Sequence, residues 1–236
     1  MTIQFHAYKT VNLSPAGIIP IINELLNTGA PVMSGIPGEF EVTSGDHNVH
    51  FLFESNANNL TYPSSGSPPN GGTVTSIEVD TGTPLFIING LSLPAVQIVG
   101  DFFAADVADA LALIFTGHDI MSSISPGGDY LPSYARFDQV YPSRNVTTVG
   151  DHGNDTFHFY PHMVGHAKIS KFITHGPKHD VIDLLKGQPF HNFHELLTHT
   201  HGGAHGVVIR LDAHDTITLT DLHSKASLHA YDFHFV

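Results

Sequence analysis

The sequence contains no cysteine and no tryptophan among its 236 residues. The absence of cysteine excludes disulfide bonds, thiolate metal ligands and cysteine nucleophiles. Basic residues are scarce too, with 9 lysines and arginines against 22 aspartates and glutamates, and the formal net charge is −13. Because phosphate binding needs a basic face, this charge argues against nucleic acid as a partner.

Long apolar runs are also lacking. No segment reaches the ~20 consecutive apolar residues that cross a bilayer, so we expect no transmembrane segment. The opening MTIQFHAYKTV has no basic stretch followed by an apolar one, which argues against a secretory signal at this end. If the protein is exported, we expect its export signal elsewhere in the chain.

Residue type and charge divide the chain into two parts. The first 135 residues contain one base, Lys9, against twelve acids, whereas 15 of the 19 histidines follow from His152 onward. Up to residue 116, strand-like runs precede a helix expected over 94–115, where apolar residues recur every three or four positions. We therefore predict a mostly β, α+β chain, with an N-terminal sheet-plus-helix module over 1–116 and a C-terminal β module over 117–236.

Within these modules, alternation and turn residues predict individual elements. Helices are expected at 14–27 and 190–198. Residues 125–150 are expected to form a loosely structured join. Strands are expected at 39–43, 49–54, 73–79, 84–88, 156–159, 168–172, 181–185, 207–211, 216–220 and 233–236.

The clearest motif is the nonapeptide G-D-H-G-N-D-T-F-H at 150–158. It is similar to GGxGxDxUx, a Ca²⁺-binding repeat in which U is a large apolar residue. Its glycines permit tight turns that expose carbonyl oxygens, and its aspartate supplies the hard anionic oxygen that Ca²⁺ prefers. The matching positions are Gly150, Gly153, Asp155 and Phe157, while Asp151 replaces the second glycine.

Our preferred ligands are Asp155, Asp151 and Asn154, together with carbonyls of the turn. Weaker Gly-then-Asp segments at 117–120 and 127–131 suggest one or two ions rather than a long array, although Gly-Asp turns also occur without any ion. The complete set of candidate calcium residues is Gly150, Asp151, His152, Gly153, Asn154, Asp155, Asp129, Asp119, Asp180 and Asp183.

Residues 150–236 resemble the C-terminal region of RTX-type (haemolysin-type) calcium-binding proteins, which are exported by type I secretion. The segments that carry the resemblance are GNDTFHF (153–159), GHAKISKF (165–172), HDVIDLL (179–185) and HAYDFHFV (229–236). The runs TVTSIEVD (73–80) and PLFIINGLSLPA (84–95) are similar to segments that precede RTX repeats. The chain departs from the family in its minimal repeat count and in the replacement of the usual acids before the final strands by Lys168, Lys171 and histidines.

The resemblance implies a degenerate parallel β-roll or β-sandwich in the C-terminal module, with Ca²⁺ as cofactor and folding coupled to Ca²⁺ outside the cell. It also implies an uncleaved export signal, an acid followed by apolar residues, recognised by ABC-type export machinery. The signal residues would be Asp232, Phe233, His234, Phe235 and Val236. The expected function is that of a secreted, extracellular, non-enzymatic calcium-binding protein.

An enzyme is disfavoured because no nucleophile–base arrangement can be assembled from the sequence. His194 and His199 flank a glutamate as in a zincin helix, but they are five residues apart instead of four, so they do not share a helix face. Neither a G-x-S-x-G elbow nor a P-loop is present.

Two alternatives keep a binding function but change the ligand. The abundant histidines suggest a scavenger of Zn²⁺, Ni²⁺ or Cu²⁺, with His199, His201 and His205 as the strongest candidate set, unless they serve as pH-sensitive groups. Haem capture is suggested by Asn59-Leu60-Thr61-Tyr62, which is similar to secreted haemophores in which such a tyrosine ligates iron.

Overall fold

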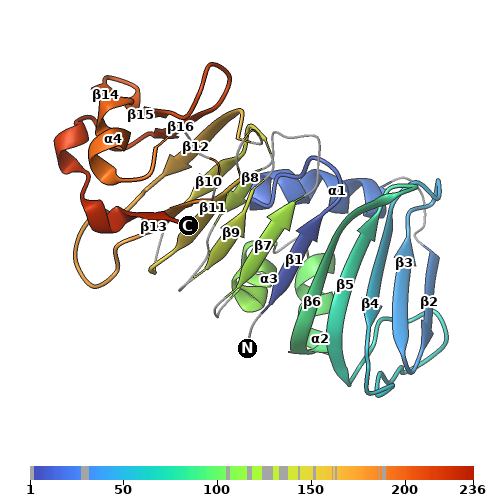
Figure 1. Ribbon diagram of the computed structural model, residues 1–236. Helices are drawn as coiled ribbons and strands as arrows, with labels where there is room; N and C mark the ends of the chain where they lie inside the picture. The colour runs from blue at the N-terminus through green and yellow to red at the C-terminus, as the bar shows by residue number, and fades with distance from the viewer. Residues whose placement is uncertain are drawn as a thin grey trace. The chain divides into compact units, whose positions relative to one another are not determined.

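The structure is a computed structural model that describes residues 3–27, 32–104, 107–115, 119–123, 130–132, 138–142, 144–150, 153–160, 162, 164–185, 187 and 190–236. The chain divides into two compact units, Met1–Thr116 and Gly117–Val236. Most of the regular structure is β, with both parallel and antiparallel pairing (Figure 1). Over these described stretches, no helix combines the length and the apolar character needed to cross a membrane.

The N-terminal unit contains an antiparallel sheet whose strands lie in the order β1-β6-β5-β4-β3-β2. Alternating apolar residues along its strands point to one buried face, as Val74, Ile77 and Val79 do. The strands are β1 (Gln4–Ala7), β2 (Val32–Ile36), β3 (Glu39–Thr43), β4 (His50–Glu54), β5 (Thr73–Asp80) and β6 (Pro84–Pro94).

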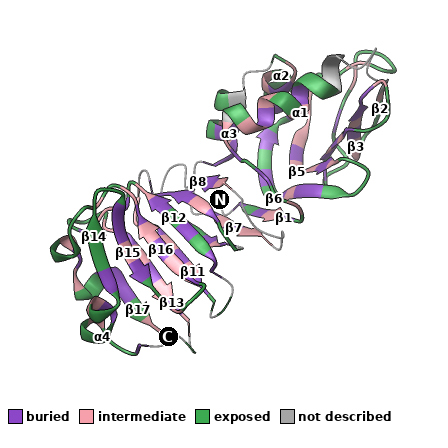
Figure 2. Cartoon of the chain, turned by 90° about the horizontal axis from the view of Figure 1, so that it is seen from above, coloured by how far each residue is buried: buried purple, intermediate pink, exposed green. Residues whose placement is uncertain are grey.

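Three helices cover this buried face: α1 (Pro15–Asn27), α2 (Ala95–Phe103) and α3 (Val107–Ile114) (Figure 2). The ring of Phe102 packs against Phe51 and Phe53, with centroid distances of 5.8 and 5.9 Å. The prediction of one helix over 94–115 is therefore wrong in that α2 ends at Phe103 and α3 begins at Val107. Both helices bury apolar residues at spacings of three and four, so the spacing pattern does not reveal the break.

In the C-terminal unit, one sheet contains β7 (Ile120–Ser123), β9 (Gln139–Tyr141), β11 (Thr156–Phe159), β13 (Val181–Leu184) and β17 (Phe233–Phe235). Each of these strands is parallel to its neighbour. A second sheet contains β8 (Tyr130–Pro132), β10 (Thr147–Val149), β12 (His166–Ser170) and β16 (Thr216–Leu219), also parallel. From β7 to β13 the chain alternates between the two sheets, one strand at a time.

The second sheet is extended by two antiparallel strands, β15 (Gly206–Arg210) and β14 (Thr200–Gly203). The short helix α4 (Phe193–Thr198) precedes them, and Asn192 caps it by accepting a hydrogen bond from the N–H of Glu195. Two single-turn 3₁₀ helices, η1 (Lys225–Ser227) and η2 (Ala230–Asp232), lead into β17.

In-register pairing stacks the inward side chains of the parallel strands into columns. The first sheet contributes Met121, Val140, Phe157, Ile182 and Phe233, and the second contributes Leu131, Thr148, Ile169 and Leu219. All nine are buried, and Figure 2 shows buried residues recurring along β11, β12 and β13. The expected loose join over 125–150 is wrong in its described part, because β8, β9 and β10 belong to these columns.

Candidate cation site

Four buried aspartates lie side by side at the N-terminal ends of adjacent strands in the first parallel sheet of the C-terminal unit. Each immediately precedes a strand: Asp119 precedes β7, Asp138 β9, Asp155 β11 and Asp180 β13. The strand register makes them neighbours on adjacent strands, which are ~4.8 Å apart in a sheet. Their exposed fractions are at most 1%. We call these four residues the aspartate ladder.

The carboxylates of Asp138, Asp155 and Asp180 each accept a hydrogen bond from the backbone N–H of the aspartate before them in the aspartate ladder. The N–H of Asp119 donates to Oδ1 of Asp138, that of Asp138 to Asp155, and that of Asp155 to Asp180, each at 3.0 Å. The second oxygen of Asp180, Oδ2, accepts the N–H of Ile173 at 2.8 Å. The side chains of Asp138, Asp155 and Asp180 therefore all point along the row in the same direction, toward the backbone of the preceding aspartate and away from solvent.

A fifth buried aspartate, Asp232, lies beside the end of the aspartate ladder. It precedes β17 but is one residue out of register, since Phe233 lies opposite Ile182. Its Oδ2 accepts the N–H of His229 at 2.7 Å. Its Oδ1 is fully buried and makes no hydrogen bond within the described part of the chain. Since a buried carboxylate oxygen is costly when left unsatisfied, a ligand at this position would stabilise it.

Burial makes the ionised state of this end of the ladder unfavourable. It raises the pKa of Asp180 to about 8, against the opposing effect of the N–H donors of Asp155 and Ile173. The negative charges of Asp155 and Asp232 raise that pKa further. Burial also raises the pKa of Asp232. Without a cation, Asp180 and Asp232 therefore keep their protons to a higher pH than free aspartates do.

The glycines at 150 and 153 serve the site in two different ways. A side chain at Gly150 would place its Cβ 2.6 Å from Oδ2 of Asp180 and 3.4 Å from the ring of Phe157, so only glycine leaves room for the carboxylate. Gly153 instead has a φ of 148°, a conformation that side chains disfavour. The turn before β11 is therefore fitted to the carboxylate of the next turn.

The aspartate ladder contains three of the calcium candidates predicted from the sequence, Asp119, Asp155 and Asp180. Gly150, Gly153 and Asn154 lie in the turn that leads to Asp155. The sequence-based prediction missed Asp138, and it assigned Asp232 only to the export signal. The signal that could have found Asp138 is an aspartate two residues before a buried apolar residue, which Asp119, Asp155 and Asp180 share.

Other predicted calcium residues lie elsewhere. Asp183 is on the outer face of β13, where its two carboxylate oxygens lie 3.0 Å from Nδ1 of His158 and 3.0 Å from Nδ1 of His234. Its carboxylate therefore does not join the aspartate ladder. The candidates Asp129, Asp151 and His152 fall outside the described residues.

The histidines predicted to bind a transition metal do not converge. His199 follows α4, His201 is on β14 and His205 is in the turn that leads to β15, and all three are exposed. Among the described residues, a different group brings metal-ligating side chains together: the ligand atoms of His162, Asp212 and Asp215 all lie within 4.8 Å of one another.

The hydroxyl of Tyr62, the predicted haem ligand, is hydrogen-bonded to the protein backbone. It lies 2.7 Å from the carbonyl oxygen of Glu39 and 3.0 Å from that of Ile36. Burial, reinforced by the charge of Glu39, raises the pKa of this phenol. Iron ligation needs the phenolate, so these surroundings disfavour that role.

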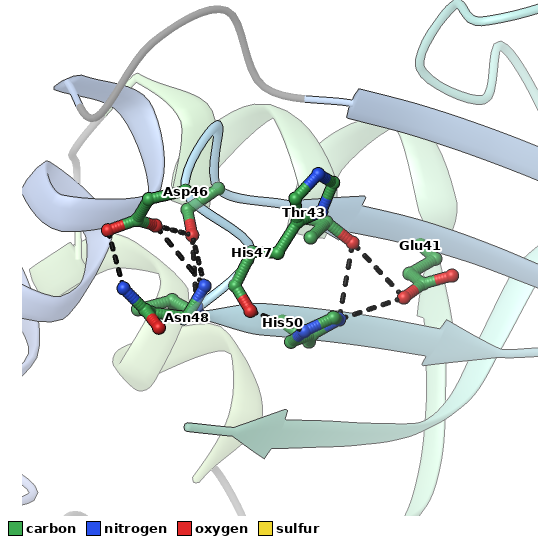
Figure 3. Close-up of polar contacts among 8 residues, drawn as sticks. Glu41, Thr43, Asp46, His47, Asn48 and His50 are labelled. Carbon is green, nitrogen blue, oxygen red and sulfur yellow. Dashed lines mark hydrogen bonds and ion pairs between the residues drawn. The ribbon is translucent and has the colours of Figure 1, made fainter. Parts of the chain in front are cut away.

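The N-terminal unit has its own acidic surface on the outer face of β3, β4 and β5. Nδ1 of His50 lies 3.1 Å from Oε1 of Glu41 and 3.2 Å from the hydroxyl of Thr43 (Figure 3). The contact with Glu41 raises the pKa of His50. An open groove of about 460 Å³ here is lined by Glu39, Glu41, His50, Leu52, Glu78, Asp80 and Gly82.

No protein-family model matches the chain, and no curated protein matches its sequence.

Proposed function

We propose that the protein is a secreted, non-enzymatic calcium-binding protein of RTX type, and that the aspartate ladder holds its Ca²⁺. The observation that carries the proposal is the in-register burial of Asp119, Asp138, Asp155 and Asp180 at the starts of adjacent parallel strands. Four neighbouring buried carboxylates need positive charge, either as protons or as cations.

We further propose that the C-terminal unit is a degenerate parallel β-roll. Support comes from the alternation of successive strands between two parallel sheets, from β7 to β13. In such an arrangement the same turn recurs at every passage through one sheet, so ligands from successive turns stack. The repeat of aspartate followed two residues later by a buried apolar residue fits this arrangement at each of the four strands.

The chemistry of the aspartate ladder favours Ca²⁺ over softer metals because every side-chain ligand is a carboxylate oxygen. A carboxylate oxygen that accepts one backbone N–H keeps a lone pair for an ion. The ion would lie between neighbouring turns and be ligated by carboxylates of both, with turn carbonyls and water completing its six to eight ligands.

Ca²⁺ binding would then be coupled to folding. Ion-free carboxylates repel one another and resist burial, whereas bound Ca²⁺ stabilises the folded state by mass action. The proposed export signal, Asp232 to Val236, fits this coupling because β17 pairs with β13 and Phe233 is buried once the unit is folded. ABC-type machinery would read the segment in the unfolded chain, and folding would follow in the Ca²⁺-containing medium.

Circular dichroism and isothermal titration on the EDTA-treated full-length protein test Ca²⁺ binding and folding together. We expect Ca²⁺ to increase β structure and to release or absorb heat, and Asp155→Asn to weaken both responses. Asp221→Asn is the matched control, since Asp221 is an exposed aspartate of the same unit that accepts the N–H of Lys171. An unchanged spectrum and no binding heat at millimolar Ca²⁺ would overturn the calcium assignment.

Export is tested separately, in a host that supplies an ABC exporter. We expect the full-length chain in the medium and a variant lacking residues 229–236 to be retained in the cell. Because the deletion also removes β17, the double variant His234→Ala/Val236→Ala is a gentler test, as both side chains are exposed. Secretion of the deletion variant at the full-length level would show that these residues are not the export signal.

A further inference from the structure

The group His162, Asp212 and Asp215 lies apart from the aspartate ladder and has a different composition. His162 follows β11, whereas both aspartates lie in the turn between β15 and β16, about fifty residues later in the chain. Their ligand atoms all lie within 4.8 Å of one another. One imidazole nitrogen with two carboxylates is a ligand set that suits first-row transition metals, and it suits Ca²⁺ poorly.

The spacing of the first pair matches two ligands of one tetrahedral ion. Nδ1 of His162 lies 3.4 Å from Oδ2 of Asp212. Zn–N and Zn–O bonds of about 2.1 Å, meeting at the tetrahedral angle, separate the two ligand atoms by about 3.4 Å. The pair is thus already at the separation that Zn²⁺ requires.

Both carboxylates are held in place by backbone donors that leave ligand capacity free. Oδ1 of Asp212 accepts the N–H groups of His214 and Asp215, at 2.7 and 2.8 Å, so Oδ2 is the oxygen that faces His162. Oδ1 of Asp215 accepts the N–H of Gly165 at 2.7 Å. Such hydrogen bonds orient metal ligands in characterised sites.

The charge state of the group also favours a cation. Two carboxylates, those of Asp212 and Asp215, lie beside one imidazole here. Asp215 is almost fully buried, and the half-exposed guanidinium of Arg144 lies 3.9 Å from its Oδ1. Arg144 only partly offsets two carboxylates, and a divalent ion would complete the neutralisation.

From this geometry we propose a second metal site, at which His162, Asp212 and Asp215 bind Zn²⁺ or a similar transition-metal dication. The ion takes Nδ1 of His162, Oδ2 of Asp212 and a carboxylate oxygen of Asp215. Because the His162 side chain is 81% exposed, the fourth position faces solvent and holds water. Ca²⁺ at the aspartate ladder and Zn²⁺ here are independent, since the two sites share no ligand.

The test is isothermal titration of the EDTA-treated full-length protein with Zn²⁺, with Ca²⁺ present in excess so that the aspartate ladder does not compete. We expect one Zn²⁺ per chain. His162→Ala and Asp212→Asn should each lower the affinity at least about tenfold, since even residues that only support metal ligands contribute that much. Asparagine keeps the Oδ1 that caps the turn, so Asp212→Asn removes the ligand oxygen alone.

One control variant and two further measurements test whether Zn²⁺ binds at this group. His214→Ala changes an exposed histidine of the same turn and should leave Zn²⁺ binding unchanged. Arg144→Ala should raise the affinity, because the competing positive charge is removed. Substituting Co²⁺ should give visible absorption bands that disappear in His162→Ala. Full Zn²⁺ affinity in His162→Ala, or binding lost only in His201→Ala/His205→Ala, would overturn the proposal, as would the absence of Zn²⁺ binding in the wild type.

Discussion

The backbone N–H of Asp155 donates a 3.0 Å hydrogen bond to Oδ1 of Asp180, and this contact joins the best-matching sequence repeat to the next turn of the unit. Asp155 and Asp180 are 25 residues apart, yet the parallel register of β11 and β13 places them opposite each other. Both carboxylates are buried at the same end of the sheet. The stability of the C-terminal unit should therefore depend on whether protons or Ca²⁺ neutralise their negative charge.

In the absence of Ca²⁺, Asp180 should make the protein less stable as the pH rises. Its pKa is raised to about 8, so the folded state keeps a proton that the unfolded chain releases above its ordinary pKa of about 4. The contribution of this group to the free energy of unfolding is therefore complete below about pH 4 and lost as the pH rises to about 8. Urea unfolding in EDTA at several pH values measures this.

Asp180→Asn isolates that contribution from those of the many histidines. The difference in unfolding free energy between wild type and variant should shrink as the pH rises through this interval. Added Ca²⁺ should remove most of the wild-type decline, because the ion replaces the proton. A difference between the two proteins that is constant with pH would show that the Asp180 carboxyl is ionised throughout.

Gly150→Ala should weaken Ca²⁺ binding as well as stability. The added Cβ would lie 2.6 Å from Oδ2 of Asp180 and displace that carboxylate from the aspartate ladder. We expect a loss of about 1–3 kcal/mol in unfolding free energy, the usual range for overpacking, together with a weaker Ca²⁺ response. Gly176→Ala makes a useful comparison, because its φ of 84° causes strain but no atom lies within 4 Å of the added Cβ. Gly176→Ala should therefore lower the unfolding free energy but leave the carboxylates of the aspartate ladder, and with them the Ca²⁺ response, in place.

His158 should make the unit sensitive to acid. Its ring stacks on Tyr141 at a centroid distance of 4.2 Å, and burial is the main cause that lowers its pKa. The folded state therefore resists a proton that the unfolded chain accepts below about pH 6.5, and stability falls as the pH drops through that value. We expect His158→Phe to keep the ring stack and to reduce the acid-dependent part of the loss, measured by thermal unfolding between pH 7 and pH 5.

The exposed His205 provides the comparison for this experiment. His205→Phe should leave the acid-dependent loss as it is in the wild type. If His158→Phe and the wild type lose stability in parallel on acidification, the sensitivity arises from other histidines.

Tyr62→Phe should lower the stability of the protein and leave its response to haem unchanged. The hydroxyl contacts the backbone at Glu39, and its removal should cost about 1 kcal/mol of unfolding free energy. Haemin added to the wild type should give no Soret band that depends on this tyrosine. A Tyr62-dependent Soret band would instead restore the haem-capture alternative.

Strands with a clear alternating pattern were predictable from the sequence. The predictions for 39–43 and 156–159 are confirmed with the same bounds as β3 and β11. β8, β9 and β10 were not predictable, because three residues are too few to show a period, and their placement depends on pairing with neighbours distant in sequence. Parallel pairing of this kind leaves little trace in local propensity.

The site was predictable in its chemistry and only partly in its membership. Asp180 and Asp183 looked equivalent in sequence, but they are three residues apart, and side chains an odd number apart in an extended chain point to opposite faces. Asp183 therefore contacts His158 and His234 instead of the aspartate ladder. Asp138 was missed because no glycine motif precedes it, and only the strand register reveals its position.

The most direct measurement is a high-resolution crystal structure of the protein grown with Ca²⁺. We expect ion density along the aspartate ladder, with carboxylate oxygens of Asp155 and Asp180 at about 2.3–2.6 Å from a shared ion. A map in which these carboxylates contact only the backbone N–H groups, with no ion at any turn of the aspartate ladder, would contradict it.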